Sequence, residues 1–331
     1  MWKKLWIFSL SSALLTVCFN TARAGEAPDK LIVPYSAIGG ASTPIWVPKE
    51  AGIFSKYGLT VDLVYIATST RIMQATLAGG VDLSFSGEEA AITANLGGGD
   101  IVVLAADVNR LPFSLYVKPI YTRVEDLRGK KLGVSRFGSS TDFTARHILA
   151  KHGLTPGKDV VFLQTGGVAE SYAALKSGAI DGGVFGSPST IKAAKEGFRE
   201  LVNMGDEDLE IYSACVTASR AWIRKNEDKL RRFMKAYVEG IARIKKDKEF
   251  TINVMRKYTR TDDREVLAAS YDYLNKMLPQ DPTPTVRAIL NGLQLVGMGN
   301  PAALKEKPER FMEPKYVKEL KDSGFIDRLY K

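Results

Sequence analysis

One order of elements occurs twice in this chain, and this repetition limits the possible folds more than any other feature of the sequence. In each copy a Gly-Leu pair precedes a predicted strand and a predicted helix, and a short segment ending in Asp then leads into an apolar strand. The paired segments are Gly58-Leu59 with Gly79–Asp82, and Gly153-Leu154 with Gly178–Asp181. Alternating strands and helices are typical of a mostly parallel sheet with helices on its faces. The repeat predicts two similar α/β lobes, with a chance likeness between ordinary strand–helix units as the alternative.

The order of the predicted elements also suggests how the two lobes are connected. A second alternating block begins at Lys131, and beyond Ser213 one more predicted strand is followed by helices with apolar residues at three- and four-residue spacing. Because these helices have no counterpart in the second block, we expect them to return to the first lobe. Two crossovers would then form a hinge. The predicted units are lobe 1 from residues 25–117 and 213–331, and an inserted lobe 2 from residues 118–212.

The first 24 residues have the pattern of a secretory signal peptide. A basic start, Met1–Lys4, precedes an apolar stretch, Leu5–Phe19, and a small-x-small site ends at Ala24. The apolar stretch is shorter than the ~20 residues that a membrane-spanning helix needs. We therefore expect cleavage after Ala24 and export to the periplasm without a lipid anchor.

The mature chain keeps a basic charge, but the distribution of this charge does not predict a polyanion site. Removal of residues 1–24 takes away three basic residues and no acidic one, so the formal net charge falls from +9 to +6. The remaining basic runs, such as those over residues 229–235 and 245–248, alternate with apolar positions on predicted helices. Runs of this kind are usually solvated helix faces. Together with export, this pattern argues against nucleic acid as a partner.

The side chains that most often perform catalysis are few. The chain has two histidines, His147 and His152, and their spacing of five places them on different faces of one predicted helix. This spacing does not fit a helical metal-binding pair. Cys215 lies in an apolar, strand-like run, which favours a buried and unreactive thiol. We expect no enzyme activity, no metal and no cofactor.

Four loops of small residues each follow a predicted strand and precede a predicted helix. In open parallel sheets such loops gather at one edge, so two facing lobes would bring all four to one cleft. Unpaired backbone N–H groups at helix starts favour an anion, and glycine and serine allow a ligand to approach them closely. Helix capping by serine and threonine is the alternative for any single loop. The loops are residues 36–43, 86–88, 138–141 and 186–190.

Three segments carry a family resemblance. Residues Pro44–Val61, Val124–Val134 and Ala173–Asp181 resemble the first-lobe signature, the second-lobe entry and the segment before the second-lobe ligand loop of one family. This family comprises the nitrate/sulfonate/taurine-type solute-binding proteins of ABC importers, within a wider group that includes thiamine-pyrimidine synthases. The likeness covers roughly residues 30–245. It implies a type II periplasmic binding fold, in which two α/β lobes close on a small molecule and present it to a membrane permease.

The resemblance also implies which residues touch the ligand, and one departure from the family bears on its charge. Glu88 and Glu89 follow Ser86-Gly87, where a carboxylate in the cleft would repel a sulfonate or nitrate unless a ligand donor pairs with it. Alternatively, both glutamates only occupy a first helical turn, where negative charge is favoured. The implied contacts are Ser36, Ser42, Ser86, Gly87, Ser139, Ser140, Thr141 and Ser187, and the same loops add Gly39, Gly40, Glu88 and Gly138 as candidates.

These features predict a periplasmic binding protein for a small organic solute that is anionic or a polar heterocycle. The expected partners are this solute and an ABC permease in the inner membrane, and the protein is expected to be a monomer. A receptor domain that signals to a membrane sensor would have the same cleft. An enzyme resembling the pyrimidine synthases is a weaker alternative, because the chain lacks their cysteine-rich motif and is exported.

Overall fold

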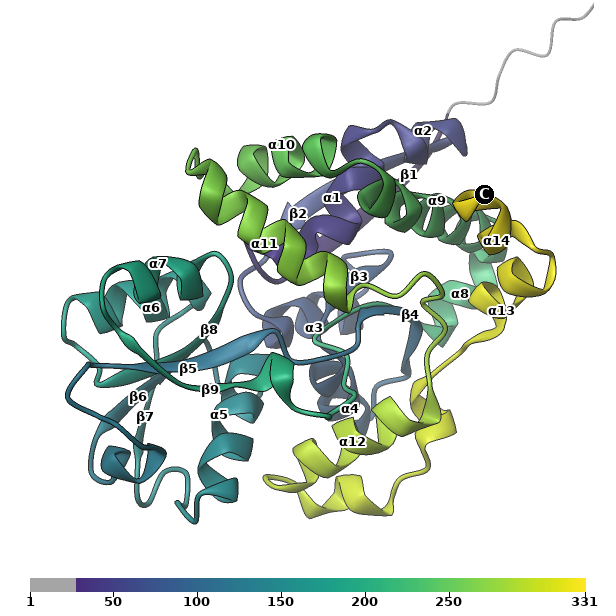
Figure 1. The fold of residues 1–331 in the computed structure, drawn as a ribbon. Coiled ribbons are helices and arrows are strands. Elements are labelled where there is room, and N and C mark those ends of the chain that lie inside the picture. Colours follow the sequence, from purple (N-terminus) through teal and green to yellow (C-terminus); the bar gives the residue numbers. More distant parts are fainter. Residues whose placement is uncertain (1–27) are drawn as a thin grey trace, which may run out of the picture.

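The structure, a computed structural model, describes residues 28–331, which form two α/β lobes (Figure 1). Each lobe contains one five-stranded sheet, so the two lobes predicted from the repeat are confirmed. The predicted signal peptide and its cleavage site after Ala24 lie outside the described residues and stay predictions. Within residues 28–331, no helix combines the length and the apolar character that crossing a membrane requires.

The sheet of lobe 1 has the order β2-β1-β3-β10-β4. Strands β1 and β2 pair in parallel, whereas β10 runs antiparallel to both of its neighbours. Every residue of β4 is buried, as expected of a strand covered on both faces. The strands are β1 (Asp29–Tyr35), β2 (Leu59–Tyr65), β3 (Ser84–Ser86), β4 (Ile101–Val108) and β10 (Ala214–Ser219).

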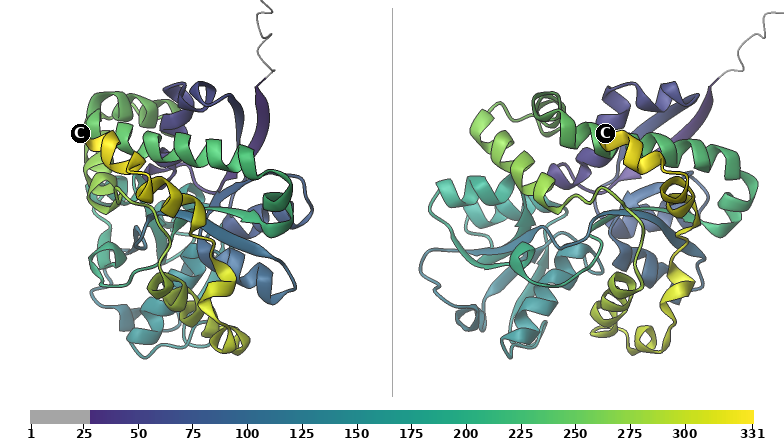
Figure 2. Two further views of the ribbon diagram at one scale, coloured as in Figure 1. Left: turned by 90° about the vertical axis from the view of Figure 1, so that its right-hand side faces the viewer. Right: turned by 45° about the vertical axis from the view of Figure 1, so that its right-hand side comes forward.

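The C-terminal helices return to lobe 1. Helix α9 (Glu227–Lys246) carries the predicted apolar stripe, and Leu230, Phe233 and Ile241 on this stripe are fully buried against the lobe 1 core. The last two helices lie on the side of lobe 1 that faces away from lobe 2 (Figures 1 and 2). The other helices of lobe 1 come from both of its chain segments. They are α1 (Thr43–Glu50), α2 (Ile53–Lys56), α3 (Ser69–Leu77), α4 (Glu88–Leu96), α8 (Arg220–Lys225), α10 (Lys248–Thr259), α11 (Arg264–Met277), α12 (Val286–Gly297), α13 (Lys315–Asp322) and α14 (Phe325–Tyr330).

Lobe 2 repeats this construction with the sheet order β7-β6-β8-β5-β9. Strand β5 is antiparallel to both neighbours, the position that β10 has in lobe 1. The strands are β5 (Phe113–Val117), β6 (Lys131–Val134), β7 (Val161–Gln164), β8 (Gly182–Gly186) and β9 (Arg199–Asn203), and the helices are α5 (Ser140–Lys151), α6 (Val168–Lys176) and α7 (Ser189–Lys195). Short 3-10 turns occur at Gly40–Ser42, Val124–Leu127, Met204–Asp206, Pro301–Lys305 and Pro308–Phe311.

The position of β5 corrects the predicted lobe boundary. The strand at Phe113–Val117 was expected to end the first part of lobe 1, but it pairs with β8 and β9 in the second sheet. The first crossover therefore lies between Val108 and Phe113, before β5. Both sheets are mixed rather than all parallel, because the strand that follows each crossover enters its sheet in the reverse direction. The two crossovers are hydrogen-bonded to each other from Ile211 N to Asn109 O at 3.2 Å.

The predicted apolar stripe of α12 is only half buried. Ile289 and Leu293 are buried, and α12 packs against α4 of lobe 1. Val286 and Leu290, which were expected in the same stripe, are 43% and 42% exposed. The apolar face of this helix is therefore narrower than its sequence pattern predicted.

A close helix crossing gives a first testable prediction. On α9, a Cβ added to Gly240 would lie 2.8 Å from three ring carbons of Pro48 on α1. Overpacking of this kind costs about 1–3 kcal/mol, and the better helix propensity of alanine offsets about 1 kcal/mol of this cost. We expect Gly240→Ala to lower the free energy of unfolding by up to about 2 kcal/mol in urea titrations. Lys235→Ala, at an exposed position of α9, should change it by less than about 0.5 kcal/mol.

Candidate functional site

A cleft lies between the two lobes, where loops from both sheets meet. Its empty volume is ≈ 930 Å³, including the part that is open to solvent. The loop after β1, the loop from β6 into α5 and the loop after β8 all contribute to its lining, together with residues of α11. Three of the four predicted small-residue loops therefore lie at this cleft, whereas the predicted loop of residues 86–88 does not line it.

Eight of the twelve predicted site residues line this cleft, and four do not. Ser86 and Gly87 lie behind the lining, and the carbonyl oxygen of Ser86 accepts a hydrogen bond from Cys215 Sγ at 3.1 Å. The carbonyl oxygen of Gly138 faces lobe 1, where it accepts a hydrogen bond from Thr70 Oγ1 at 3.2 Å. Glu88 is the fourth residue outside the lining. The eight lining residues are Ser36, Gly39, Gly40, Ser42, Ser139, Ser140, Thr141 and Ser187.

The sequence did not identify several other lining residues. Thr68 and Ser69 follow β2 and begin α3, so the strand-then-helix rule that found the other loops could have found them. The contribution of α11 had no such signal, because its lining residues belong to a helix far along the chain. These residues of α11 are Ser270, Tyr273, Leu274 and Met277.

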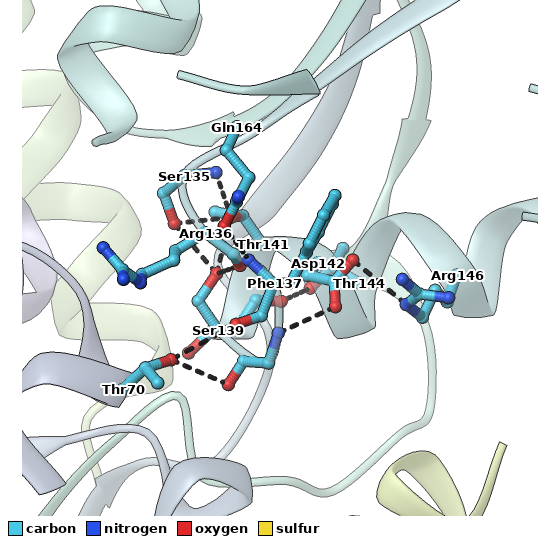
Figure 3. A network of polar contacts seen from close by, with 12 residues as sticks. Thr70, Ser135, Arg136, Phe137, Ser139, Thr141, Asp142, Thr144, Arg146 and Gln164 are labelled. Atoms are coloured by element: carbon cyan, nitrogen blue, oxygen red, sulfur yellow. Dashed lines mark hydrogen bonds and ion pairs between the residues drawn. The ribbon is translucent and has the colours of Figure 1, made fainter. Parts of the chain in front are cut away.

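The start of α5 is organised by hydroxyl groups (Figure 3). Ser135 N donates a hydrogen bond to Thr141 Oγ1 at 2.9 Å, and the hydroxyls of Ser135 and Thr141 are 2.8 Å apart. Ser139 precedes the helix, but its hydroxyl does not cap α5 and donates instead to Arg136 O at 2.6 Å. The first N–H groups of α5 therefore have no side-chain cap from Ser139 and remain available beside the cleft.

A buried carboxyl group from lobe 1 reaches the first residue of α5. Glu89, on the first turn of α4, is fully buried, and its Oε1 accepts a hydrogen bond from Ser140 Oγ across the lobes. Its other oxygen, Oε2, is buried without a hydrogen-bond partner. The glycine at position 87 makes room for this contact, because a Cβ there would collide with both carboxyl oxygens and with Ser140 Oγ. Burial raises the pKa of Glu89 to about 7.

Glu88 points elsewhere, which corrects its predicted ligand contact. Its carboxyl group lies against Gly292 of α12, where a Cβ would be 2.6 Å from Glu88 Oε1. Both of its oxygens are buried without partners. Burial, and secondarily the neighbouring Glu89, raises the pKa of Glu88 well above its usual range.

A third buried carboxyl group belongs to the same region of lobe 1. Asp107, on β4, accepts a hydrogen bond from Tyr237 Oη at 2.5 Å through its Oδ2, while its Oδ1 has no partner. Burial raises the pKa of Asp107 to about 7. Burial likewise raises the pKa of the Cys215 thiol, with smaller contributions from Glu88, Glu89 and Asp107. Cys215 is thus a buried thiol, as its sequence context predicted.

The two lobes also touch where the loop after β8 meets the loop after β1 and helix α11. Gly40 N donates to Ser187 O at 3.4 Å, and a Cβ on Gly39 would lie 2.7 Å from this same carbonyl oxygen. The hydroxyls of Ser187 and Ser270 are 2.5 Å apart. Only glycine at position 39 permits this approach, because the nearest atom is backbone rather than a side chain that could move.

Comparisons with known proteins identify the family. The family model described as "NMT1/THI5 like" matches residues 40–249. The curated protein "Putative binding protein YtlA" of Bacillus subtilis strain 168 is 23% identical over 290 residues, which cover 86% of each chain.

Solved structures share the fold. The alkanesulfonate-binding protein SsuA of Xanthomonas axonopodis pv. citri, bound to MOPS, superposes with a TM-score of 0.71 at 18% identity, over 87% of this chain and 98% of SsuA. The periplasmic nitrate-binding protein NrtA of Synechocystis PCC 6803 superposes with a TM-score of 0.74 at 14% identity, over 90% of this chain and 89% of NrtA. The expected periplasmic binding fold is confirmed, and the chain belongs to the NMT1/THI5-like family.

Proposed function

We propose that this protein is the solute-binding component of an ABC importer, which is exported to the periplasm, captures a small organic solute between its lobes and delivers it to a permease. The observation that carries this proposal is the cleft itself. Loops from both lobes line it, and within residues 28–331 two adjacent crossovers join the sheets, so one rotation of lobe 2 against lobe 1 would open or close the cleft.

The chemistry of the lining favours reversible capture. Small polar side chains and backbone groups of both lobes line the cleft and can hold a polar group closely without a covalent step. The curated relative and the two solved structures described above are named as binding proteins, which favours binding over catalysis. We therefore propose a monomeric binding protein without enzyme activity.

Native mass spectrometry of the protein purified from its own periplasm tests capture directly. We expect one non-covalent adduct of low mass, which disappears under denaturing conditions. The mature chain should begin at Gly25, which the intact mass also reports. Cys18 lies within the predicted signal peptide, and a mature chain that begins with a lipidated Cys18 would contradict the proposed periplasmic location without a lipid anchor.

Small-angle scattering tests whether the lobes close on the solute, and a substitution at Gly39 tests whether closure can be blocked. Removing the co-purified solute should increase the radius of gyration, and adding it back should decrease the radius again. Gly39→Val should prevent this decrease, because its side chain would meet the carbonyl of Ser187 as the lobes approach. Gly80→Ala, whose new Cβ would have an ordinary contact at 3.6 Å from Ala75 O, should close like the parent. Absence of both an adduct and a change in radius would overturn the proposed function.

A further inference from the structure

Several hydroxyl groups that line the cleft have used their hydrogens inside the protein. Ser42 donates to Ala37 O at 2.6 Å, and Ser139 donates to Arg136 O at 2.6 Å. Ser140 donates to the Glu89 carboxylate from the first turn of α5. Each hydroxyl has one hydrogen but can accept through its lone pairs. These serines can therefore offer a ligand acceptors rather than donors.

The hydroxyls where the loop after β8 meets α11 have also used their hydrogens inside the protein. Ser270 donates its hydrogen to Val266 O at 2.7 Å. The short contact between the Ser187 and Ser270 hydroxyls must then use the hydrogen of Ser187. Thr68 and Ser213 also line the cleft, and their buried hydroxyl oxygens have no hydrogen-bond partner. These two hydroxyls can still either donate or accept a hydrogen bond.

The ionisable group directly behind this set of acceptors is a carboxyl group. Among the described residues that line the cleft there is no lysine, arginine or histidine. Glu89 lies behind Ser140, fully buried, with its Oε2 unpartnered. A carboxylate at this place also supplies the negative charge that the start of α5 favours, so the helix does not need an anion from the ligand.

We propose that the cleft selects a solute whose inserted end is an N–H donor without negative charge, an alkylammonium or guanidinium group, and that Glu89 is the residue that determines this preference. The inference rests on the proposed function and specifies the class of solute. Ser140 accepts from the ligand while it donates to Glu89, and the unpartnered Glu89 oxygen provides the opposite charge. An anionic group at the same place would face oxygen lone pairs and, once Glu89 is ionised, a buried carboxylate in a medium of low dielectric, where repulsion is strong.

Two pairs of probes test this preference in the mature protein after its co-purified solute has been removed. Butylammonium and butylguanidinium are compared with butanesulfonate and nitrate by isothermal titration calorimetry. We expect the cationic probes to bind at least about ten-fold more tightly than butanesulfonate. Glu89→Gln keeps the size of the side chain and an acceptor for Ser140 but removes the charge, so it should reduce this ratio by about ten-fold.

Glu88→Gln is the matched control, because it changes a neighbouring buried carboxyl group that faces α12 instead of the cleft. It should leave the ratio between cationic and anionic probes unchanged. Circular dichroism and thermal unfolding of each variant report whether it folds like the parent. Tighter binding of butanesulfonate than of butylammonium, or an unchanged ratio in Glu89→Gln, would overturn the inference.

The identity of the co-purified solute decides the question independently of the probes. A solute with an ammonium, amidinium or guanidinium nitrogen supports the inference even where the small probes bind too weakly to measure. A solute whose only polar group is a sulfonate, phosphonate or carboxylate overturns the inference while it leaves the proposed function intact. Absence of any solute and of any closure overturns the proposed function itself.

Discussion

Raising the pH from about 5.5 to about 8 should destabilise this protein, because three buried carboxyl groups hold protons in the folded state that the unfolded chain loses. Burial raises the pKa of Glu89 from 4.5 to about 7 and that of Asp107 from 3.8 to about 7, and it raises the pKa of Glu88 well above 4.5. Each pK unit corresponds to about 1.4 kcal/mol, and about 1.5 units lie between a pH of about 5.5 and the folded pKa of about 7, so Glu89 and Asp107 should each remove about 2 kcal/mol across this interval.

The sign follows from the number of bound protons. Between the unfolded and the folded pKa of each carboxyl group, the folded protein holds the proton that the unfolded chain has lost, so the free energy of unfolding falls as pH rises. His147 acts in the opposite direction below its unfolded value of 6.5, because burial lowers its pKa. One imidazole opposes three carboxyl groups, so the net slope should stay negative.

Asp107→Asn isolates one of these groups. Between pH values of about 5.5 and 8, the difference in unfolding free energy between Asp107→Asn and the parent should shift in favour of the variant by about 2 kcal/mol, independently of the difference at the lower pH. Tyr237→Phe removes the hydrogen bond that favours the charged carboxylate, so it should move the transition to higher pH. Urea titrations at five pH values measure both effects. Parallel curves for Asp107→Asn and the parent would show that Asp107 is not the titrating group.

The sequence predicted the parts of this molecule that depend on local pattern. The strand and helix on either side of Ser36–Ser42 follow from an apolar run, a glycine-rich loop and a proline in the first turn, all of which act within a few residues. The loops around Ser140 and Ser187 reach the cleft because the carboxyl ends of neighbouring parallel strands share an edge.

Other parts depend on contacts between distant residues and could not be predicted in this way. Strand β5 resembles any buried strand, and its place in lobe 2 is decided by pairing with β8 and β9. Glu88 and Glu89 are adjacent in the sequence and both lie in the first turn of α4, as one alternative required. Their side chains nevertheless leave the helix in different directions, so one faces α12 and the other faces Ser140.

Replacing Trp46 by alanine should have the largest effect of any single substitution considered for this protein. The Trp46 side chain, on α1, is fully buried and stacks on Tyr258 of α10 with ring centroids 4.6 Å apart and planes at 8°. It also meets Tyr35, at the end of β1, in an edge-to-face contact with centroids 5.7 Å apart. Loss of a buried tryptophan costs about 3–5 kcal/mol, because the removed area leaves a cavity that the surroundings fill only in part.

Trp222→Ala is the matched control for this prediction. Trp222 lies on α8, is half-buried and donates from Nε1 to Asp82 Oδ1 at 2.8 Å, so its removal should cost no more than about 2 kcal/mol. Urea unfolding of both variants gives the comparison, and equal losses would contradict the central role of Trp46 in the core.

The position of Trp46 connects this core to the cleft. Tyr35 leads directly into the loop Ser36–Ser42, so the ring that Trp46 holds in place also fixes the first cleft loop. In the variant this loop is less ordered and must become ordered when the solute binds. This ordering costs conformational free energy and weakens binding relative to the parent. Trp46→Ala should therefore bind the co-purified solute more weakly than the parent even under conditions in which both are folded. Trp46→Phe, which keeps an aromatic ring beside Tyr35, should recover most of the affinity but only part of the stability.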